Sequence, residues 1–379
     1  MHADMVTAAL IVVATFVAAT LTGSLRRLAV RWGIVDQPGP RSVHQHAVPL
    51  LGGVALFFAF AISVLLHFGL SDPKMDGTLL GGFVVLLLGT ADDTARFWGT
   101  RLLWARDAEG RGLRPAVKLV VEIGAALILY FFGVQIGYVS HVLGPTSFGP
   151  VASLLVTVFW VVAITNAMNL IDGLDGLTTG VTAIASLVLL IIALRAGQDE
   201  TVALAACLLG SNLGFLPWNF YPARIFMGDG GALFLGFILA SIAVIGPIKG
   251  PTVMSLAVPI LALGLPVFDT FAAIVRRFRE HRMVGQADRG HLHHRMLDWG
   301  FTHRGAVTVL YVMSGWLGVG ALEVSQASWW VGSGIMLFAV VSVFALARTL
   351  PVALHARPVA AQSGQLPAVP PARRPGIGA

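Results

Sequence analysis

The sequence predicts an all-α, polytopic integral membrane protein of about eleven transmembrane helices, with its N-terminus outside and its C-terminus in the cytoplasm. Three observations predict this class. Of the 379 residues, 56% are hydrophobic and 12% are charged, about half the charged fraction of an average soluble domain. Apolar runs of bilayer length recur along the whole chain, and basic residues gather in alternate connections. Soluble, collagenous, coiled-coil and disordered classes are therefore excluded.

Eleven apolar runs approach the length of about 20 residues that a spanning helix needs. Asp4 precedes the first run and three arginines follow it, which is the reverse of the flanks of a cleavable signal peptide. We therefore expect this run to remain as a span with its N-terminus outside. The runs lie near residues 5–23, 49–68, 78–91, 115–133, 150–169, 177–195, 201–217, 230–246, 252–275, 304–322 and 328–347.

The basic residues support this topology. With the N-terminus outside, 22 of the 25 Lys and Arg residues fall in inner segments, and only Lys74, Arg195 and Lys249 fall in outer ones. The positive-inside rule predicts this asymmetry for an odd number of spans. The net charge of +6 is thus explained by orientation and phosphate handling rather than by nucleic-acid binding.

We expect one transmembrane domain over residues 1–349, followed by a disordered, Pro- and Ala-rich cytoplasmic tail over residues 350–379. Cys207, the single cysteine, lies in an apolar run, so no intrachain disulfide can form. The sequence shows no internal repeat of 20 to 50 residues, which weakens an inverted-repeat transporter interpretation.

Six aspartates lie where carboxylates are costly. A charge within a span costs roughly 2.5 to 3.5 kcal/mol, so each of these residues needs a partner, water or a metal ion. Solvation at the interface could explain any one of them. Six at the same predicted face suggest a site, and they are Asp92, Asp93, Asp172, Asp175, Asp229 and Asp269.

The most informative segment is Asn166-Ala-Met-Asn169-Leu-Ile-Asp172-Gly-Leu-Asp175-Gly-Leu. Steps of three residues turn a helix by about 300°, so these four polar side chains can face one ligand only if the helix breaks. Gly173 and Gly176 could provide that break. A glycine-rich turn explains the glycines, but it does not explain two asparagines inside an apolar run.

Three further positions could act on phosphate. Asp92 and Asp93 repel each other unless a cation or metal lies beside them, although Arg96 could instead make this a capped helix end. Asp229 could be an N-cap, a Mg²⁺ ligand, or both, because it stands among glycines at the start of an apolar run. Lys118 could snorkel to the interface or bind a diphosphate in the aspartate cavity.

Histidines cluster in the largest inner loop, in Asp288-Arg-Gly-His291-Leu-His293-His294-Arg295. No Cys or Glu lies nearby to complete a tetrahedral zinc site. Imidazole and guanidinium groups could bind phosphate or pyrophosphate instead. A solvated basic loop would explain the arginines but not the histidines.

In chain order, these segments closely resemble the bacterial polyprenyl-phosphate N-acetylglucosamine-1-phosphate transferases of glycosyltransferase family 4. The related phospho-N-acetylmuramoyl-pentapeptide translocases usually carry three consecutive histidines where this chain has His-Leu-His-His. The matching elements are Arg41-Ser-Val-His44, Pro49-Leu-Leu-Gly-Gly, Asp92-Asp93, the Lys118 segment, Asn166 to Leu177, Phe226-Met-Gly-Asp229-Gly-Gly and Asp288 to Arg295. There are two departures from the family pattern. The connection of 24 residues between Asp93 and Lys118 is longer than usual, so the segment Trp104 to Leu113 resembles an insertion, and Leu50 stands where relatives often carry a basic residue.

The resemblance implies transfer of N-acetylglucosamine 1-phosphate from a UDP-sugar to polyprenyl phosphate, with release of UMP. It implies catalytic roles for Asp92, Asp93, Asp172 and Asp175, and Mg²⁺ or Mn²⁺ on Asp229 and Asn169. The implied partners are UDP-N-acetylglucosamine, polyprenyl phosphate and the bilayer, with no nucleic acid, and a homodimer is compatible with the sequence. The implied substrate-binding residues are Lys118, Asn166, Asn219, Asp288, Arg289, His291, His293, His294 and Arg295.

The resemblance also implies a place and a pathway: the inner (plasma) membrane, a site facing the cytoplasm, and the start of envelope polysaccharide synthesis. Our hypothesis is direct attack by the lipid phosphate with Asp92 as the base, and a covalent aspartyl-phosphate route stays open because the same carboxylates could be nucleophiles. A muramoyl-pentapeptide donor is the alternative within this superfamily. Of other classes, an ion-coupled transporter should hold its acids near the midplane, and an intramembrane prenyltransferase should carry a third aspartate after Asp93.

Overall fold

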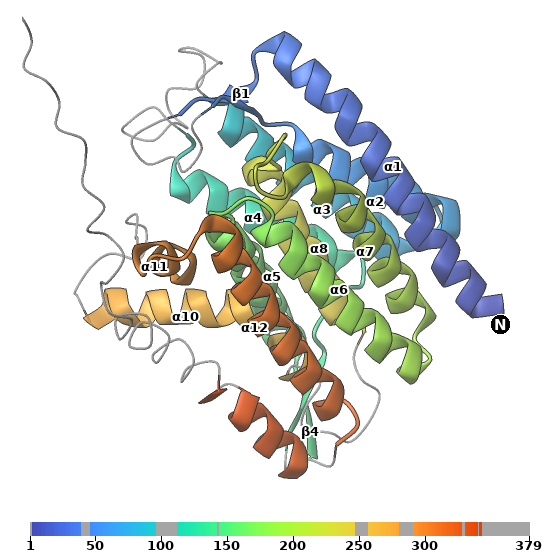
Figure 1. The fold of residues 1–379 in the computed structure, drawn as a ribbon. Helices are drawn as coiled ribbons and strands as arrows, with labels where there is room; N and C mark the ends of the chain where they lie inside the picture. Colours follow the sequence, from blue (N-terminus) through green and yellow to red (C-terminus); the bar gives the residue numbers. More distant parts are fainter. Residues whose placement is uncertain are drawn as a thin grey trace, which may run out of the picture.

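The computed structural model describes residues 2–38, 46–95, 112–141, 144–246, 257–279, 291–327, 330–339 and 341–342. Helices account for most of it (Figure 1). They are α1 (His2–Trp32), α2 (Gly52–Phe68), α3 (Pro73–Thr94), α4 (Pro115–Phe131), α5 (Pro150–Ile171), α6 (Leu177–Ala196), α7 (Asp199–Asn219), α8 (Gly228–Ile245), α9 (Ala257–Ala262), α10 (Gly264–Arg279), α11 (Leu292–Asp298), α12 (His303–Val324) and a last helix, Trp330–Ala339.

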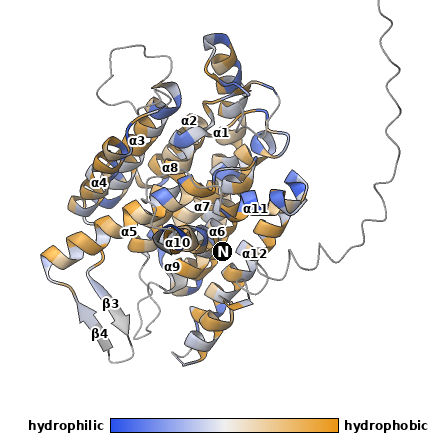
Figure 2. Ribbon diagram, turned by 90° about the vertical axis from the view of Figure 1, so that its left-hand side faces the viewer, coloured by the Kyte–Doolittle hydropathy of each residue, from blue (hydrophilic) through white to orange (hydrophobic). Residues whose placement is uncertain are grey.

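Seven helices are long and apolar enough to cross a membrane, and each coincides with a predicted run. They are α1, α3, α5, α6, α7, α8 and α12. Figure 2 shows hydrophobic residues along their lengths, with hydrophilic residues mainly towards the helix ends. The prediction of an all-α membrane protein is thus confirmed, while the total of eleven spans and the orientation of the termini stay predictions. The predicted tail, residues 350–379, lies outside the described residues.

The ninth predicted run, 252–275, is not one continuous helix in the described part of the chain. It is divided into α9 and α10, and α10 crosses the neighbouring helices at a steep angle (Figures 1 and 2). Pro266 falls in the first turn of α10, where its missing N–H costs nothing, but it would break the ladder of a longer helix. The run contained a helix start that apolar length alone did not reveal.

Two short antiparallel hairpins were not predicted. One pairs β1 (Val35–Asp36) with β2 (Val48–Pro49), and the other pairs β3 (Tyr138–His141) with β4 (Gly144–Ser147). The first hairpin matters for the site because the Pro49 carbonyl, at the end of β2, accepts a hydrogen bond of 2.8 Å from the Phe226 N–H. This bond connects the segment before α2 to the segment before α8.

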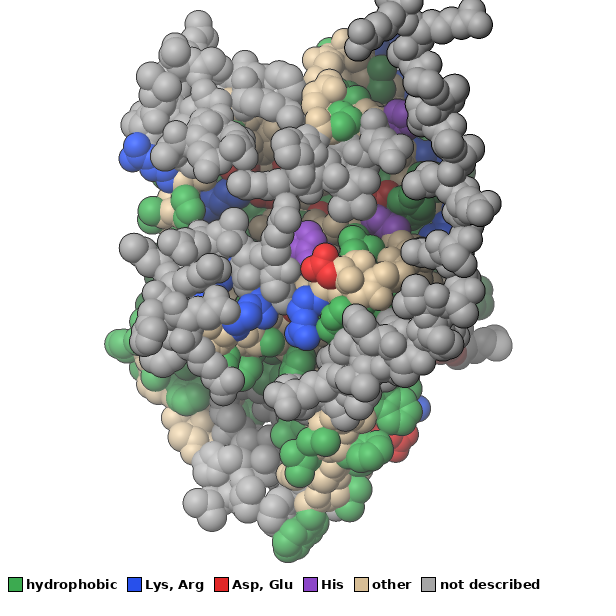
Figure 3. Space-filling view, turned by 60° about the vertical axis from the view of Figure 1, so that its left-hand side comes forward, with side chains coloured by type: hydrophobic (Ala, Val, Ile, Leu, Met, Phe, Trp, Pro, Cys, Tyr) green, Lys and Arg blue, Asp and Glu red, His purple; other side chains and the backbone are tan. Residues whose placement is uncertain are grey.

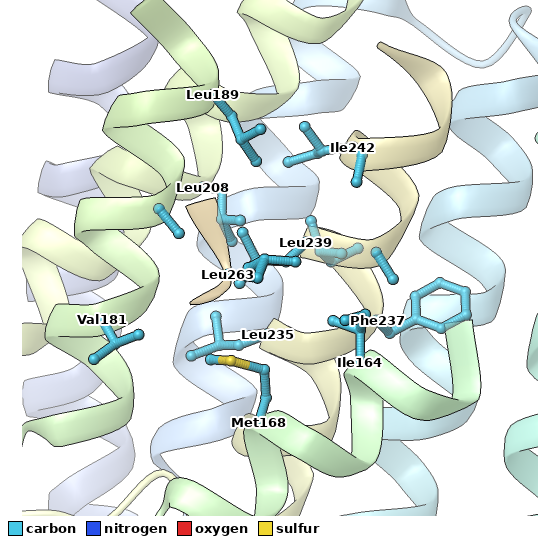
Figure 4. Close-up of a cluster of buried hydrophobic side chains, with 14 of the residues drawn as sticks. Ile164, Met168, Val181, Leu189, Leu208, Leu235, Phe237, Leu239, Ile242 and Leu263 are labelled. Carbon is cyan, nitrogen blue, oxygen red and sulfur yellow. The ribbon is translucent and has the colours of Figure 1, made fainter. Parts of the chain in front are cut away.

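Helix α8 lies at the centre of the bundle and packs against α2, α3, α5, α6 and α7. Figure 4 shows Leu235 of α8 close to Met168 of α5, while the Phe237 ring points to the other side of α8, where a side chain on Gly81 of α3 would meet it. Nearly every side chain of α8 is buried, so the helix is apolar on all sides, as expected of a core helix in a membrane bundle. A rigid α8 gives the polar residues at its N-terminus a fixed position.

Candidate active site

A cluster formed by Asp92, Asp93, Asp229 and Lys118 lies where α3 ends and α4 and α8 begin. The Lys118 ammonium forms ion pairs with Asp92 and, at 2.9 Å, with Asp229. The Asp92 carboxylate also accepts a 2.5 Å hydrogen bond from the Leu113 N–H. Only a quarter of the Lys118 side chain is exposed, so the lysine is directed into the site rather than out to the interface. Its cation offsets the mutual repulsion of the carboxylates.

Glycines allow α2 and α3 to approach the start of α8 closely. A side chain on Gly89 of α3 would collide with the backbone of Gly230 in α8, and one on Gly53 of α2 would collide with Gly231. The N–H groups of Gly52 and Gly53 each donate a 2.9 Å hydrogen bond, to the carbonyls of Phe226 and Met227 respectively. The Leu-Gly-Gly element near the N-terminus therefore supports the Phe-Met-Gly-Asp segment and sets the position of Asp229.

Asp93 has a different role from Asp92. Its carboxylate accepts hydrogen bonds from the backbone N–H groups of Asp229, at 3.0 Å, and Gly230, at 3.3 Å. These are unpaired donors of the first turn of α8, so Asp93 of α3 caps this helix from outside. The interpretation of Asp229 as the N-cap is wrong, because Asp229 lies inside α8 and Met227 holds the cap position. The Asp229 side chain is thereby free to face Lys118.

The helix break predicted at Gly173 and Gly176 is confirmed. Helix α5 ends at Ile171, α6 begins at Leu177, and Gly176 adopts the left-handed conformation with φ of 81°, which favours glycine. The two asparagines of α5 face different partners. Asn166 donates to the Glu122 carboxylate on α4 and to the Val162 carbonyl, whereas Asn169 lies beside Asp229.

The segment from Asp172 to Gly176 is held mainly from α7 and the loop after it. Asp175 accepts a 2.9 Å hydrogen bond from the Ala223 N–H. Asn219, nearly fully buried, accepts from the Gly176 N–H and the Thr179 hydroxyl and donates to the Ile225 carbonyl. Asp175 and Asn219 therefore position this segment in the structure, while Asn169 of the same motif lies beside Asp229 of the cluster. Convergence of the four polar side chains on one ligand is only partial.

Asp172, in the loop after α5, is half-buried. Burial, with Asp229 and Asp175 nearby, raises the pKa of its carboxyl to about 7. Between about pH 4 and pH 7 the folded protein keeps a proton on Asp172 that the unfolded chain loses. The free energy of unfolding therefore falls as pH rises through this range. The total loss above the range is at most about 4 kcal/mol.

We therefore expect Asp172→Asn to reduce the loss of thermal stability between about pH 5 and pH 8, measured in Mg²⁺-free detergent. The buried charge no longer forms in this variant. Asp298→Asn, which removes an exposed carboxylate of α11, is the control and should follow the wild type. Equal pH slopes for Asp172→Asn and the wild type would contradict the prediction.

The histidines lie beside this segment. His291 Nδ1 is 3.0 Å from the Asp269 carboxylate of α10, whose other oxygen accepts from the Leu292 N–H at 2.9 Å. Burial, with His294 next to it, lowers the pKa of His293 to about 3, so this ring is neutral near pH 7. Arg295 lies over the Trp299 ring, 4.9 Å from its centroid. His293 is thus a buried group near Gly173, and its role in substrate binding stays a prediction.

His293 and Gly173 fit against each other. The imidazole occupies the place of a side chain on Gly173, so Gly173→Ala should lower the free energy of unfolding by about 1–3 kcal/mol through overpacking. The double variant Gly173→Ala/His293→Ala should recover part of this loss in thermal unfolding. Gly124→Ala is the matched control, because that site on α4 has open space around it. No destabilisation by Gly173→Ala would disprove the contact.

Two residues of α12 were missed at the sequence level. The Tyr311 hydroxyl donates a 2.5 Å hydrogen bond to the Gly176 carbonyl, and its ring takes the place of a side chain on Gly180. His303 stacks on Tyr221 and lies 4.0 Å from Asp175. A tyrosine inside an apolar run needs a partner for its hydroxyl. The position of Tyr311 in such a run was therefore the one sequence feature that could have indicated its contact.

Other predicted positions cannot be placed. Asp288, Arg289, the Arg41-Ser-Val-His44 element and residues 104–111 of the expected insertion lie outside the described residues. On the face in Figure 3, acidic and histidine side chains of the described residues lie close together in the upper part, with basic side chains beside and just below them.

The cluster can be tested against a divalent cation. Among the described residues no three His, Cys, Asp or Glu side chains form a ready metal site. The donors at hand are the carboxylates of Asp92 and Asp229 and the amide of Asn169, which are the oxygen ligands that Mg²⁺ prefers. Lys118 shows that this position accepts positive charge. The donor chemistry therefore fits Mg²⁺.

Fold and site together define a multi-pass helical membrane protein with an acidic site where several of its helices end on one side. The model of glycosyl transferase family 4 matches residues 75–247, and the chain belongs to this family. The "Probable undecaprenyl-phosphate N-acetylglucosaminyl 1-phosphate transferase" of Bacillus subtilis is 33% identical over 323 residues, 85% of this chain and 86% of the relative. The "Decaprenyl-phosphate N-acetylglucosaminephosphotransferase" of Mycolicibacterium smegmatis is also 33% identical, over 87% of this chain and 86% of its own length.

A relative from the neighbouring branch covers less of the chain. The "Phospho-N-acetylmuramoyl-pentapeptide-transferase" of Limosilactobacillus fermentum is 33% identical over 220 residues, which are 56% of this chain and 64% of the relative. The wider coverage by the N-acetylglucosamine enzymes agrees with the branch indicated by the histidine loop.

Proposed function

We propose that this protein transfers N-acetylglucosamine 1-phosphate from UDP-N-acetylglucosamine to polyprenyl phosphate in the membrane. The observation that carries the proposal is the Lys118 ammonium between Asp92 and Asp229 at the ends of their helices. Such a site can neutralise two anionic phosphates that approach from the membrane and from water. Two relatives that cover most of the chain are named for this activity, with undecaprenyl or decaprenyl phosphate.

In the proposed reaction an oxygen of the lipid phosphate attacks the β-phosphorus of the UDP-sugar. A new phosphorus–oxygen bond forms, the bond between the β-phosphorus and the bridging oxygen breaks, and UMP leaves. The lipid phosphate is already largely ionised near pH 7, so the site has at most one proton to remove. Charge neutralisation and positioning contribute more here than a strong base does.

Each residue has a proposed part in this scheme. Lys118 binds phosphate oxygens, and Asp92 accepts the remaining proton of the lipid phosphate. Asp93 holds the first turn of α8, and Asp229 with Asn169 holds Mg²⁺ or Mn²⁺. The bound cation supplies Lewis-acid charge stabilisation at the phosphates. His294, Arg295 and the Asp288-Arg289 segment contact the sugar nucleotide, while His291 and His293 position that loop.

The proposed location is the inner (plasma) membrane, with the site facing the cytoplasm. The distribution of Lys and Arg supports this orientation, and the supply of a nucleotide-sugar in the cytoplasm agrees with it. The product would begin the assembly of an envelope polysaccharide. A mass measurement in detergent tests whether the active unit is a homodimer.

The test uses membranes that express the chain, polyprenyl phosphate and a panel of UDP-sugars, with UMP as the readout. We expect UMP release with UDP-N-acetylglucosamine, dependent on the lipid acceptor and lost with a chelator. Activity with the muramoyl-pentapeptide donor alone would move the protein to the neighbouring branch. UMP release without acceptor, or none with any donor, would refute the transferase proposal. A phosphorylated Asp92 or Asp93 trapped from UDP-sugar alone would replace direct attack by the covalent route.

A further inference from the structure

A largely apolar cavity lies apart from the acid cluster, between the end of α7 and the start of α12. Its volume is about 470 Å³, and its walls are formed by Leu216, Pro217, Phe220, Tyr221, Pro222, Arg224 and Arg304. No acidic side chain is present among these lining residues, and none of the cluster residues reaches it. The cavity therefore presents two positive charges and an apolar wall without a counter-charge of its own.

Hydrogen bonds hold the Arg304 guanidinium in place, and the guanidinium groups of both arginines stay accessible. Arg304 donates two N–H groups to the Tyr221 carbonyl, at 3.2 and 3.3 Å, which leaves its other N–H groups for a ligand. Arg224 lies over the Trp218 ring at 6.0 Å, and its carbonyl accepts from Arg26. Both side chains are exposed. Guanidinium groups held this way match the geometry of phosphate oxygens.

The apolar side of the cavity continues along α7. Leu213, Leu216, Pro217 and Phe220 recur at helical spacing on one face of this helix, and all four are at least partly exposed. The cavity lies where this face ends, beside Trp218, and tryptophan is a residue type enriched where a helix leaves the bilayer. An occupant would therefore be an amphiphile, with apolar chains along α7 and an anionic head between the arginines.

We propose that this cavity binds the phosphate headgroup of an anionic bilayer phospholipid. A phospholipid is favoured over the polyprenyl phosphate acceptor because a phosphate in this cavity would not meet Lys118, Asp92 or Asp229. It is favoured over a free phosphate because the apolar face of α7 would then remain uncovered. The inference goes beyond the proposed transferase activity and does not depend on it.

Native mass spectrometry of the delipidated full-length protein, titrated with phosphatidylglycerol or phosphatidylcholine, tests the proposal. We expect the wild type to retain phosphatidylglycerol in preference, and Arg224→Gln/Arg304→Gln to lower its retention about tenfold. The matched control is Arg27→Gln/Arg31→Gln, which removes two exposed arginines of α1 outside the cavity and should bind as the wild type does.

A second variant keeps both charges. Leu216→Trp fills the apolar wall and should also reduce phosphatidylglycerol binding, so the proposal stays testable even if the arginine variant fails to fold. Unchanged retention in a folded variant, equal retention of phosphatidylcholine, displacement by glycerol phosphate alone, or one-for-one displacement by polyprenyl phosphate would each overturn the proposal. Because binding is measured without turnover, its failure is distinct from failure of the transferase activity.

Discussion

Replacing Lys118 with Met should lower turnover by about 10²- to 10³-fold, the usual effect of removing one preorganised electrostatic stabiliser. Lys118 is the cation between Asp92 and Asp229, and without it two carboxylates and two substrate phosphates would face each other. Release of UMP measures the loss. The same variant should be stabilised against heat by Mg²⁺ more than the wild type is, because the unpaired carboxylates gain more from a divalent ion.

Lys74→Met is the matched control for this prediction. Lys74 also stands in the first turn of a helix and forms a 2.9 Å ion pair, with Glu200. It lies at the start of α3, however, whereas Asp92 lies at the end of that helix. This half-exposed pair should contribute little, so turnover and the Mg²⁺ response should match those of the wild type. Comparable losses in both variants would show that Lys118 acts only on stability.

Replacing Asp229 with Asn should lower turnover by about 10³-fold or more, since a bound metal contributes several kcal/mol to a phosphoryl-transfer barrier. The amide keeps the size of the side chain and its place in α8, but it removes the charge that binds Lys118 and the proposed cation. Heat stabilisation by Mg²⁺ should disappear. This response is opposite to that of Lys118→Met, which separates metal binding from general damage.

Asp298→Asn serves as the control for Asp229→Asn, because its exposed carboxylate belongs to α11 on the same face of the bundle. It should retain turnover and the Mg²⁺ response. If Asp229→Asn kept wild-type turnover, or kept full stabilisation by Mg²⁺, the assignment of Asp229 to the metal would be withdrawn.

Local sequence was sufficient for much of the fold. Apolar runs place α1 to α8 and α12 because a helix in a bilayer must satisfy its own backbone and cover its length with apolar side chains. The break after Ile171 was also predictable from glycines and spaced polar residues. The start of α10 at Gly264 was missed because its apolar run hides the boundary.

The candidate site was predictable in part. The types of residue identified Asp92, Asp93, Lys118 and Asp229, because charges near spans are costly and need partners. The cap that Asp93 makes on α8 could not be predicted, since Asp93 and Asp229, whose N–H it binds, lie 136 positions apart. The contact of His293 with Gly173 likewise joins segments whose separation in the sequence carries no information about their distance.

The low charge content of this chain thus determined its class, its expected spans and the short set of residues able to carry chemistry. A spanning helix forms its backbone hydrogen bonds within itself and needs apolar side chains along its length, so the local sequence is enough to predict it. Only the tertiary structure decided which carboxylate meets Lys118, which one caps α8, and which histidine is buried and neutral. These outcomes depend on glycines such as Gly53 and Gly89 that let separate helices approach, and electrostatic interaction depends on that final distance.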